Sequence, residues 1–149
     1  MTQIRTARAH DARAIRKLIR LYPDRLVQDY VPATKFFFVA EVDPVRKLRD
    51  AIVKRSSKLS VSNGAGKQIV GCCALEIYSK KIAEIRSLSV HSDFQGQGIA
   101  TALVAACVER AKKRKIKEVL AITGAVKLFE KSGFSTLQHE KYAMLKMLE

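Results

Sequence analysis

The chain has 149 residues, with 28 Lys and Arg against 14 Asp and Glu, so its formal net charge is +14 at pH 7. This length is typical of one domain that buries a sizeable core. Because 48% of the residues are hydrophobic, the composition excludes a disordered or low-complexity chain. The charge favours attraction to nucleic acid, anionic lipid or a phosphate-bearing ligand, or it is a solvated basic surface; composition does not choose among these.

No stretch reaches the roughly 18 apolar residues of a membrane span, and the basic N-terminal segment lacks the apolar run of a signal peptide. We therefore expect a cytoplasmic protein with no membrane partner. The three cysteines, Cys72, Cys73 and Cys107, fit no metal-ligand spacing, so we expect no metal site. Adjacent Cys72 and Cys73 should point to opposite faces of a strand, and all three thiols should be reduced and buried.

The first half of the chain predicts a strand, a helix and a second strand. Gln3–Ala7 alternates as a strand does, and Asp11 is placed to cap a helix that ends at Pro23. Its apolar stripe consists of Ile15, Leu18, Ile19 and Tyr22. Lys35–Val42 predicts a second strand. Pro44–Ser62 has two interpretations: an insertion with a short basic helix, or a connection to a hairpin that pairs Leu59–Ser62 with the next strand.

The second half predicts strands at Gln68–Tyr78, Ile82–Val90 and Glu118–Ile122 and helices from Gly98 to Lys113 and from Ala125 to Ser132, with Gly133 as the C′ residue. Phe134–Leu137 and Tyr142–Leu148 predict a closing antiparallel pair. A strand followed by a helix implies parallel pairing, and hairpins imply antiparallel pairing. The fold class is therefore α/β, with a mixed sheet and helices on both faces.

One segment carries the strongest chemical signal. A strand ending at Val90 leads into a polar loop with Gly96 and Gly98, and a helix begins directly afterwards. The unpaired N–H groups and the positive dipole end of such a helix attract anions. Glycines let the backbone approach a ligand closely, so the loop suits a pyrophosphate or is an ordinary turn with glycines for geometry. The spacing matches neither a Walker loop nor a dinucleotide-binding fingerprint.

The segment Gln95-Gly96-Gln97-Gly98-Ile99-Ala100 resembles Q/R-x-x-G-x-G/A, the acetyl-CoA loop of the GCN5-related N-acetyltransferase (GNAT) superfamily. The segment AVKLFEKSGF (125–134) is similar to a second motif of that family. The residues around AEIRSLSVHSDFQGQGIA most resemble amino-acid N-acetyltransferases and the acetyltransferase domains of N-acetylglutamate synthases. The resemblance implies a single N-acetyltransferase domain over residues 1–149, with its fourth and fifth strands splayed apart.

The resemblance also implies the ligand contacts. Acetyl-CoA would bind between the splayed strands, and coenzyme A would leave as product. Its pantetheine arm would pair with the backbone of Leu88, Ser89 and Val90 and run past Lys127 and Phe129. Its pyrophosphate would take N–H groups across the loop and the hydroxyl of Thr101; the loop residues are Gln95, Gly96, Gln97, Gly98, Ile99 and Ala100.

Glu84 is the candidate general base, because it occupies the fourth strand where the histone acetyltransferase branch has its glutamate. It is equally read as a strand carboxylate paired with Lys80 or Arg86, and many relatives use a water chain instead. Arg86 shares its face, where it can hold a substrate carboxylate or serve as a cross-strand partner. Phe129 stands where the family commonly has a tyrosine that acts as general acid. Because Phe cannot donate a proton, the general acid is unassigned. His10, His91 and His139 are predicted surface residues.

The predicted function is acetyl transfer from acetyl-CoA to a primary amine of a small molecule such as an amino acid, by direct attack. A carboxylate-bearing acceptor suits a basic protein, whereas a lysine-rich protein substrate would be repelled. The alternatives are a protein or peptide N-acetyltransferase and a non-catalytic module that binds nucleic acid or a partner. We expect no nucleic acid, because the aromatic residues fall in strand patterns and Trp is absent. The family's habit of dimerising makes a homodimer an open prediction.

Overall fold

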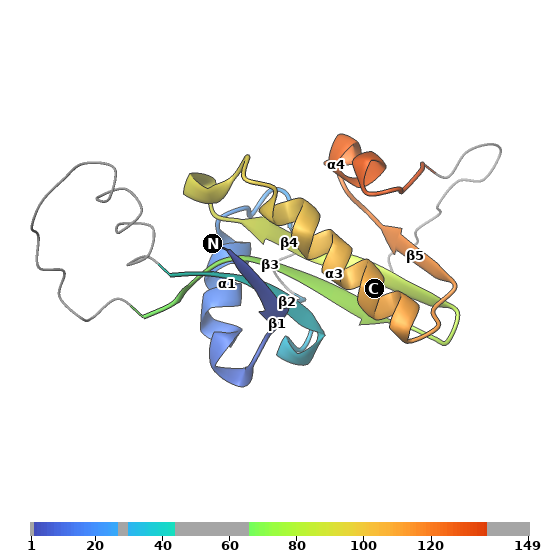
Figure 1. Ribbon diagram of the computed structural model, residues 1–149, viewed down its shortest axis with the longest axis horizontal. Coiled ribbons are helices and arrows are strands. Elements are labelled where there is room, and N and C mark those ends of the chain that lie inside the picture. Colours follow the sequence, from blue (N-terminus) through green and yellow to red (C-terminus); the bar gives the residue numbers. More distant parts are fainter. Residues whose placement is uncertain (1, 27–29, 44–65, 137–149) are drawn as a thin grey trace, which may run out of the picture.

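The computed structural model describes residues 2–26, 30–43 and 66–136. Five strands form one sheet in the order β1-β2-β3-β4-β5 (Figure 1). Their bounds are Gln3–Thr6, Phe37–Val42, Gln68–Ile77, Ile82–Val90 and Glu118–Ala121. β1 to β4 pair antiparallel, and β5 pairs parallel to β4, because the chain crosses over the sheet through a helix between them. The predicted mixed sheet is confirmed.

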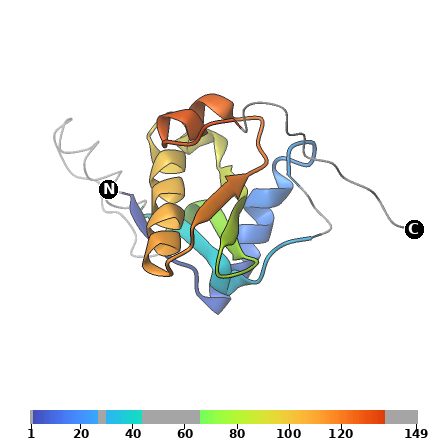
Figure 2. The same ribbon diagram turned by 90° about the vertical axis from the view of Figure 1, so that its right-hand side faces the viewer.

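Helices cover both faces of this sheet. Figure 2 shows α1 (Ala12–Arg20) on one side and α3 (Ile99–Lys113) on the other, with α4 (Val126–Lys131) above α3. The side chains of Ile15, Leu18 and Ile19 pack under α1, and those of Leu103, Val104 and Cys107 pack under α3. Adjacent strand residues point to opposite faces, so Cys72 joins the α1 core while Cys73 joins the α3 core. All three cysteines are free thiols and buried, as predicted.

The last two strands of the sheet, β4 and β5, diverge partway along it. The β4–β5 ladder runs from Ile82 opposite Glu118 to Ile85 opposite Ala121, yet β4 continues to Val90. The β3–β4 register shifts between Cys72 and Ala74, so that Ser87 and Leu88 face a single β3 residue. This is a β-bulge, which bends a strand and increases its twist. Ser87 has a φ of 51°, in the left-handed region that a non-glycine residue seldom adopts. The pairing of the fourth and fifth strands therefore ends at Ile85, where β5 also ends, and the bulge follows directly along β4.

Three sequence-based expectations need correction. Lys35 and Phe36 lie in a 3-10 turn, so the second strand begins at Phe37. Asp11 makes no side-chain cap on α1, because its carboxylate binds Arg5 and the N–H of Arg8 instead. The strand predicted from Phe134 is absent over residues 134–136, and the rest of the closing pair lies outside the described residues, as does the chain from Pro44 to Ala65.

Phe134 is diverted from a strand by the way α4 ends. The Gly133 N–H bonds to the Glu130 carbonyl at 3.0 Å, and the Phe134 N–H bonds to the Phe129 carbonyl at 3.0 Å. These two bonds, with Gly133 at φ 85°, form a Schellman C-cap, and the expected apolar contact accompanies it. The Phe129 and Phe134 rings meet edge to face with centroids 5.2 Å apart. This cap holds Phe129, a candidate site residue, in a fixed position.

Candidate active site

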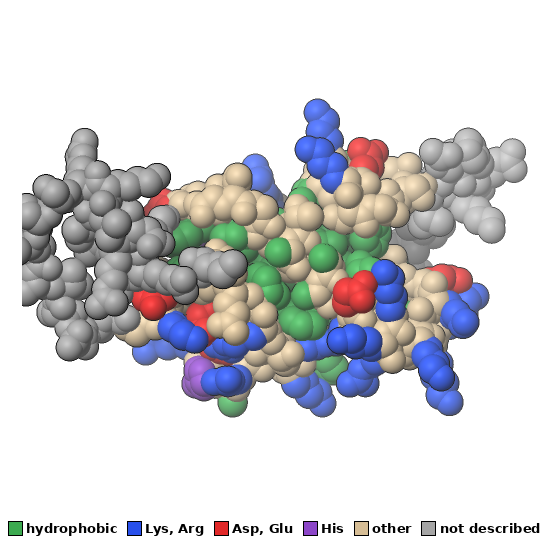
Figure 3. All heavy atoms as spheres, viewed as in Figure 1, with side chains coloured by type: hydrophobic (Ala, Val, Ile, Leu, Met, Phe, Trp, Pro, Cys, Tyr) green, Lys and Arg blue, Asp and Glu red, His purple; other side chains and the backbone are tan. Residues whose placement is uncertain are grey.

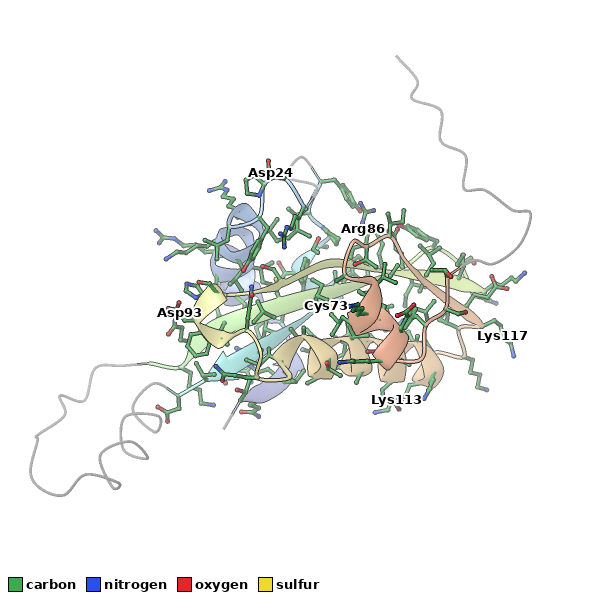
Figure 4. The ribbon with its side chains drawn as sticks, turned by 90° about the horizontal axis from the view of Figure 1, so that it is seen from above. Asp24, Cys73, Arg86, Asp93, Lys113 and Lys117 are labelled. Atoms are coloured by element: carbon green, nitrogen blue, oxygen red, sulfur yellow. The ribbon has the colours of Figure 1, made fainter. Side chains whose placement is uncertain are left out.

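A large open cleft lies where β4 and β5 diverge. Its volume is about 1070 Å³, at the upper end of the range for small-molecule sites. One wall is β4 from Ile85 to Val90, and the other is the segment from Ile122 to Ala125 after β5. The loop before α3 closes one end, and Leu128 and Phe129 of α4 line it as well. Figure 4 looks down on this region, with Asp24 and Lys113 on opposite sides of β4.

The loop at the end of the cleft is built to present backbone N–H groups. Gly96 and Gly98 have φ values of 72° and 76°, which favour glycine at these positions. A Cβ added at either residue would meet nothing within 4 Å, so the space beside the loop is free for a ligand. Gly98 is the N-cap of α3, a helix of 15 residues, and no side chain caps that end. The first N–H groups of α3 therefore have no side-chain cap, as an anion site requires, and the pyrophosphate contact stays a prediction.

A tyrosine from the other side of the sheet fixes this loop. The Tyr22 hydroxyl donates to the Val90 carbonyl at 2.6 Å and accepts from the Gln95 side-chain amide at 2.8 Å. The same Gln95 amide donates to the Val90 carbonyl at 3.1 Å. Gln95 thus ties the loop to the end of β4. Sequence reasoning assigned Tyr22 to the apolar stripe of the first helix, and its i+7 spacing gave no sign of a partner 68 residues away.

A polar cluster lies on the α1 face of β3 and β4, beside the bulge. Arg86 Nη1 donates to Glu76 Oε2 at 3.2 Å and to the Tyr78 hydroxyl at 3.3 Å, and it lies 3.9 Å from Glu84 Oε2. The Arg86 guanidinium also covers the ring of Tyr30, 5.1 Å from its centroid. The Tyr30 hydroxyl donates to Glu76, and the Tyr78 hydroxyl donates to Glu84. Burial and this bond to Glu84 raise the pKa of Tyr78 to about 12, so it is a donor at neutral pH.

The two glutamates of this cluster are largely buried, with 13% and 11% of the side chains of Glu76 and Glu84 exposed. They share one guanidinium, so the group carries a net charge of about −1 when both are ionised. Such a group attracts an ammonium ion. Arg86 itself lines the cleft, whereas Glu84, the candidate base, is not among the lining residues. The pairing of Glu84 with Arg86 is therefore observed, and its role as a base stays a prediction.

Most of the predicted ligand residues line the cleft, and two do not. Gln97 and Lys127 are exposed and lie outside its lining. The lining includes the other predicted positions: Arg86, Leu88, Ser89, Val90, Gln95, Gly96, Gly98, Ile99, Ala100, Thr101 and Phe129. Sequence reasoning missed the contribution of Asp24 and Arg25, which follow α1 and come from a stretch without any motif.

Very little of the protein's positive charge faces the cleft. Arg25 and Arg86 are the cationic side chains in its lining among the described residues. Lys112, Lys113, Arg114 and Lys115 lie at the far end of α3, about 20 Å from the loop at 1.5 Å per residue. We therefore expect phosphate binding in this cleft to depend on backbone N–H groups, which is how helix N-termini hold anions.

An open mixed sheet, a splayed parallel pair and an anion loop before a helix define an acyl-CoA-dependent transferase. The chain belongs to the acetyltransferase (GNAT) family, whose sequence model matches residues 16–134. It is an N-acetyltransferase, and acetyl-CoA is its cosubstrate. None of the helices in the described part of the chain has the length and hydropathy of a membrane span.

Relatives and solved structures agree with this assignment. An uncharacterised N-acetyltransferase of Chlorobaculum tepidum is 27% identical over 95% of this chain and 80% of its own length. An amino-acid acetyltransferase of Mycobacterium tuberculosis is 25% identical over 91% of this chain and 69% of its own length.

Some of the similar solved structures are coenzyme A complexes. Rv2747 of Mycobacterium tuberculosis, solved with CoA and NLQ, superposes with a TM-score of 0.69 at 23% identity, over 95% of this chain and 76% of that one. An N-acetylglutamate synthase of Neisseria gonorrhoeae, solved with coenzyme A and N-acetyl-glutamate, gives 0.64 at 19% identity over 89% of this chain, which spans 28% of that longer protein. At these identities the likeness shows the fold.

Proposed function

We propose that this protein acetylates the primary amine of a small molecule of the amino-acid class, by direct attack of the amine on the acetyl thioester. The observation that carries the proposal is the position of Arg86, which lines the cleft beside the bulge while Glu76 and Tyr78 hold it in place. The amino-acid acetyltransferase among the relatives supports the same acceptor class. We further propose that residues 1–149 act as a single domain.

The cleft fits acetyl-CoA, which supplies the activated acetyl group. The N–H groups from Gly96 to Ala100 hold its pyrophosphate at the N-terminus of α3, with the Thr101 hydroxyl beside them. The backbone of β4 from Leu88 to Val90 lies beyond the last β5 partner and therefore offers free edge groups to the pantetheine amides. Because these contacts are neutral and rigid, little reordering of the protein accompanies binding.

The bulge provides an oxyanion donor. The Ser87 carbonyl points toward Cys72 of β3, whose sulfur lies 3.7 Å away. The C=O and N–H groups of a trans peptide point in opposite directions, so the Leu88 N–H points away from β3. Ser87 and Leu88 both line the cleft. We assign this N–H to the thioester oxygen, where negative charge develops as the amine attacks.

The α1-face cluster prepares the acceptor. Its excess negative charge draws the ammonium form of the substrate toward β4, and Glu84 accepts the proton that must leave before attack. Among the described residues Arg86 bonds through Nη1 alone, so Nε and Nη2 remain for a substrate carboxylate. Phe129 is 5% exposed and donates no proton, so it does not serve as the acid for the leaving thiolate.

A panel of amines with detection of released thiol tests the acceptor class. We expect turnover with free amino acids and at least a tenfold lower kcat/KM for their α-amides, which lack the carboxylate that Arg86 holds. Arg86→Gln should remove most of this preference. Equal rates for acids and amides would disprove the carboxylate assignment, and a melting temperature unmoved by acetyl-CoA would disprove the cleft as its binding site.

A further inference from the structure

A buried thiol of β3 contacts the β4 bulge from the α1 face of the sheet. Cys72 Sγ lies 3.7 Å from the Ser87 carbonyl oxygen, to which it donates. Burial raises the pKa of Cys72 to about 12, and a bond from the backbone of Ser89 to the same sulfur opposes this shift. The Cys72 side chain has no exposed surface, and its strand partner is Ser89. The thiol therefore bonds to the strand on both sides of Leu88.

These bonds replace the ladder contacts that the bulge removes. An extra residue in a bulge leaves backbone groups without a partner in the opposite strand. Ser87 is partly buried, so its carbonyl is stabilised by a protein hydrogen bond, and the left-handed φ of this residue adds strain of its own. The conformation persists only where the surroundings hold it, and the sulfur of Cys72 is the group that reaches it from β3.

We propose that Cys72 is a positioning residue for acetyl transfer, acting through the Ser87–Leu88 peptide. The thiol holds the Ser87 carbonyl toward β3, and the planar trans peptide then directs the Leu88 N–H into the cleft. Without the thiol the peptide loses its partner and can rotate, so the N–H no longer meets the thioester oxygen in one fixed direction. The inference rests on the proposed function, in which that N–H stabilises the oxyanion.

The neighbouring cysteine provides a matched control. Cys73 has no exposed surface either, but it points to the α3 face, where its sulfur lies 3.6 Å from that of Cys107. Loss of its thiol removes the same atom from an equally buried position of the same strand. It leaves the bonds from Cys72 to the bulge intact. A comparison of the two alanine variants therefore distinguishes loss of packing from loss of positioning.

The first experiment compares the steady-state kinetics of Cys72→Ala, Cys72→Ser and Cys73→Ala, with melting temperatures measured alongside. We expect Cys72→Ala to lower kcat about tenfold, less than the full loss of an oxyanion donor, while KM for acetyl-CoA stays within about twofold. Cys72→Ser should recover most of kcat, because a hydroxyl also donates to the carbonyl. Cys73→Ala should lower the melting temperature without changing kcat. Equal losses of kcat in both alanine variants would overturn the proposal.

A second measurement decides the case without an acceptor. Amide hydrogen exchange of the peptide that contains residues 86–89 should be faster in Cys72→Ala than in Cys73→Ala, and restored in Cys72→Ser. If the wild-type protein turns over no amine, the proposed function fails while this comparison still tests the thiol. Unchanged exchange in Cys72→Ala shows that the sulfur does not hold the peptide.

Discussion

Arg5 joins two elements by holding two carboxylates at once. Its guanidinium bonds to Asp11 at 2.7 and 3.1 Å and to Glu41 of β2 at 2.8 and 3.2 Å. Hydrogen bonds from Arg5 hold the pKa of both carboxyls below the ordinary range. The sequence favoured a helix cap for Asp11. Its bond to Arg5, six residues earlier in a strand, has no periodic pattern that would reveal it.

This arrangement predicts a stability that depends on pH. A carboxyl whose folded-state pKa is lowered stabilises the fold above its unfolded pKa, near 4, and the contribution is lost as pH falls through the folded value. Arg5→Gln should therefore lower the free energy of unfolding by about 3 kcal/mol at pH 6. The difference from wild type should shrink between pH 4 and pH 2 in urea titrations. A difference that stays constant with pH would contradict the assignment.

Glu84 and Glu76 allow a matched test of the base, since both touch Arg86. Glu84→Gln should lower kcat by about a hundredfold and leave KM for acetyl-CoA unchanged, because only proton removal is lost. Glu76→Gln removes a charge from the same cluster and should affect mainly KM for the acceptor. Steady-state kinetics at saturating acetyl-CoA measures both. Equal effects on kcat would show that Glu84 acts only by anchoring Arg86.

At the scale of elements, the strands and helices of the described residues follow from their patterns, while the bulge does not. The glycine loop, the helix after it and the C-cap at Gly133 have local signals, because each needs a residue type at a fixed position. The bulge at Ser87 depends on the register between β3 and β4. In the segment IAEIRSLSV no alternation marks where one extra residue enters. The resemblance to a known family therefore predicted a cleft between the fourth and fifth strands. Its geometry, including the bulge, is known only from the structure.

The two left-handed glycines give a prediction for the loop. Gly98→Ala and Gly133→Ala place a Cβ at φ values of 76° and 85°, and neither Cβ meets an atom within 4 Å. Each should cost about 1 kcal/mol of stability through backbone strain. Only Gly98→Ala should also weaken acetyl-CoA binding, by roughly tenfold, because it alters the N-terminus of α3. Isothermal titration calorimetry measures the affinity for acetyl-CoA, and denaturant melts measure the stability of each variant. Equal affinities in both variants would exclude the loop as the phosphate site.

At the scale of the whole molecule, the charge and the cleft are separate. The exposed face of α1 carries Arg13, Arg16, Lys17 and Arg20, and Figure 3 shows Lys and Arg side chains around the edge of the opposite face. Such charges act at long range and raise the local concentration of an anion. Composition gave the sign and size of the charge but not its location, because location depends on folding.

This separation predicts that salt acts on association. The association rate of acetyl-CoA should fall about tenfold between low and high ionic strength, and the dissociation rate should change by less than about twofold. Replacing Arg13, Arg16, Lys17 and Arg20 with Gln together should reduce the association rate and its dependence on salt. Stopped-flow binding measures both rates. A salt effect confined to dissociation would indicate ionic contacts inside the cleft.

The divergence of β4 from β5 has a consequence for the protein without its cosubstrate. Beyond Ile85, the side of β4 that faces β5 has no strand partner among the described residues, and an unpaired edge is a template for other extended chains. Edge strands are usually protected by charge, proline or a covering element. Here the proposed protection is the bound pantetheine arm, which completes the sheet as an added strand does. Acetyl-CoA should therefore reduce self-association. We expect light scattering to increase more slowly with acetyl-CoA than without it, at concentrations where the free enzyme aggregates.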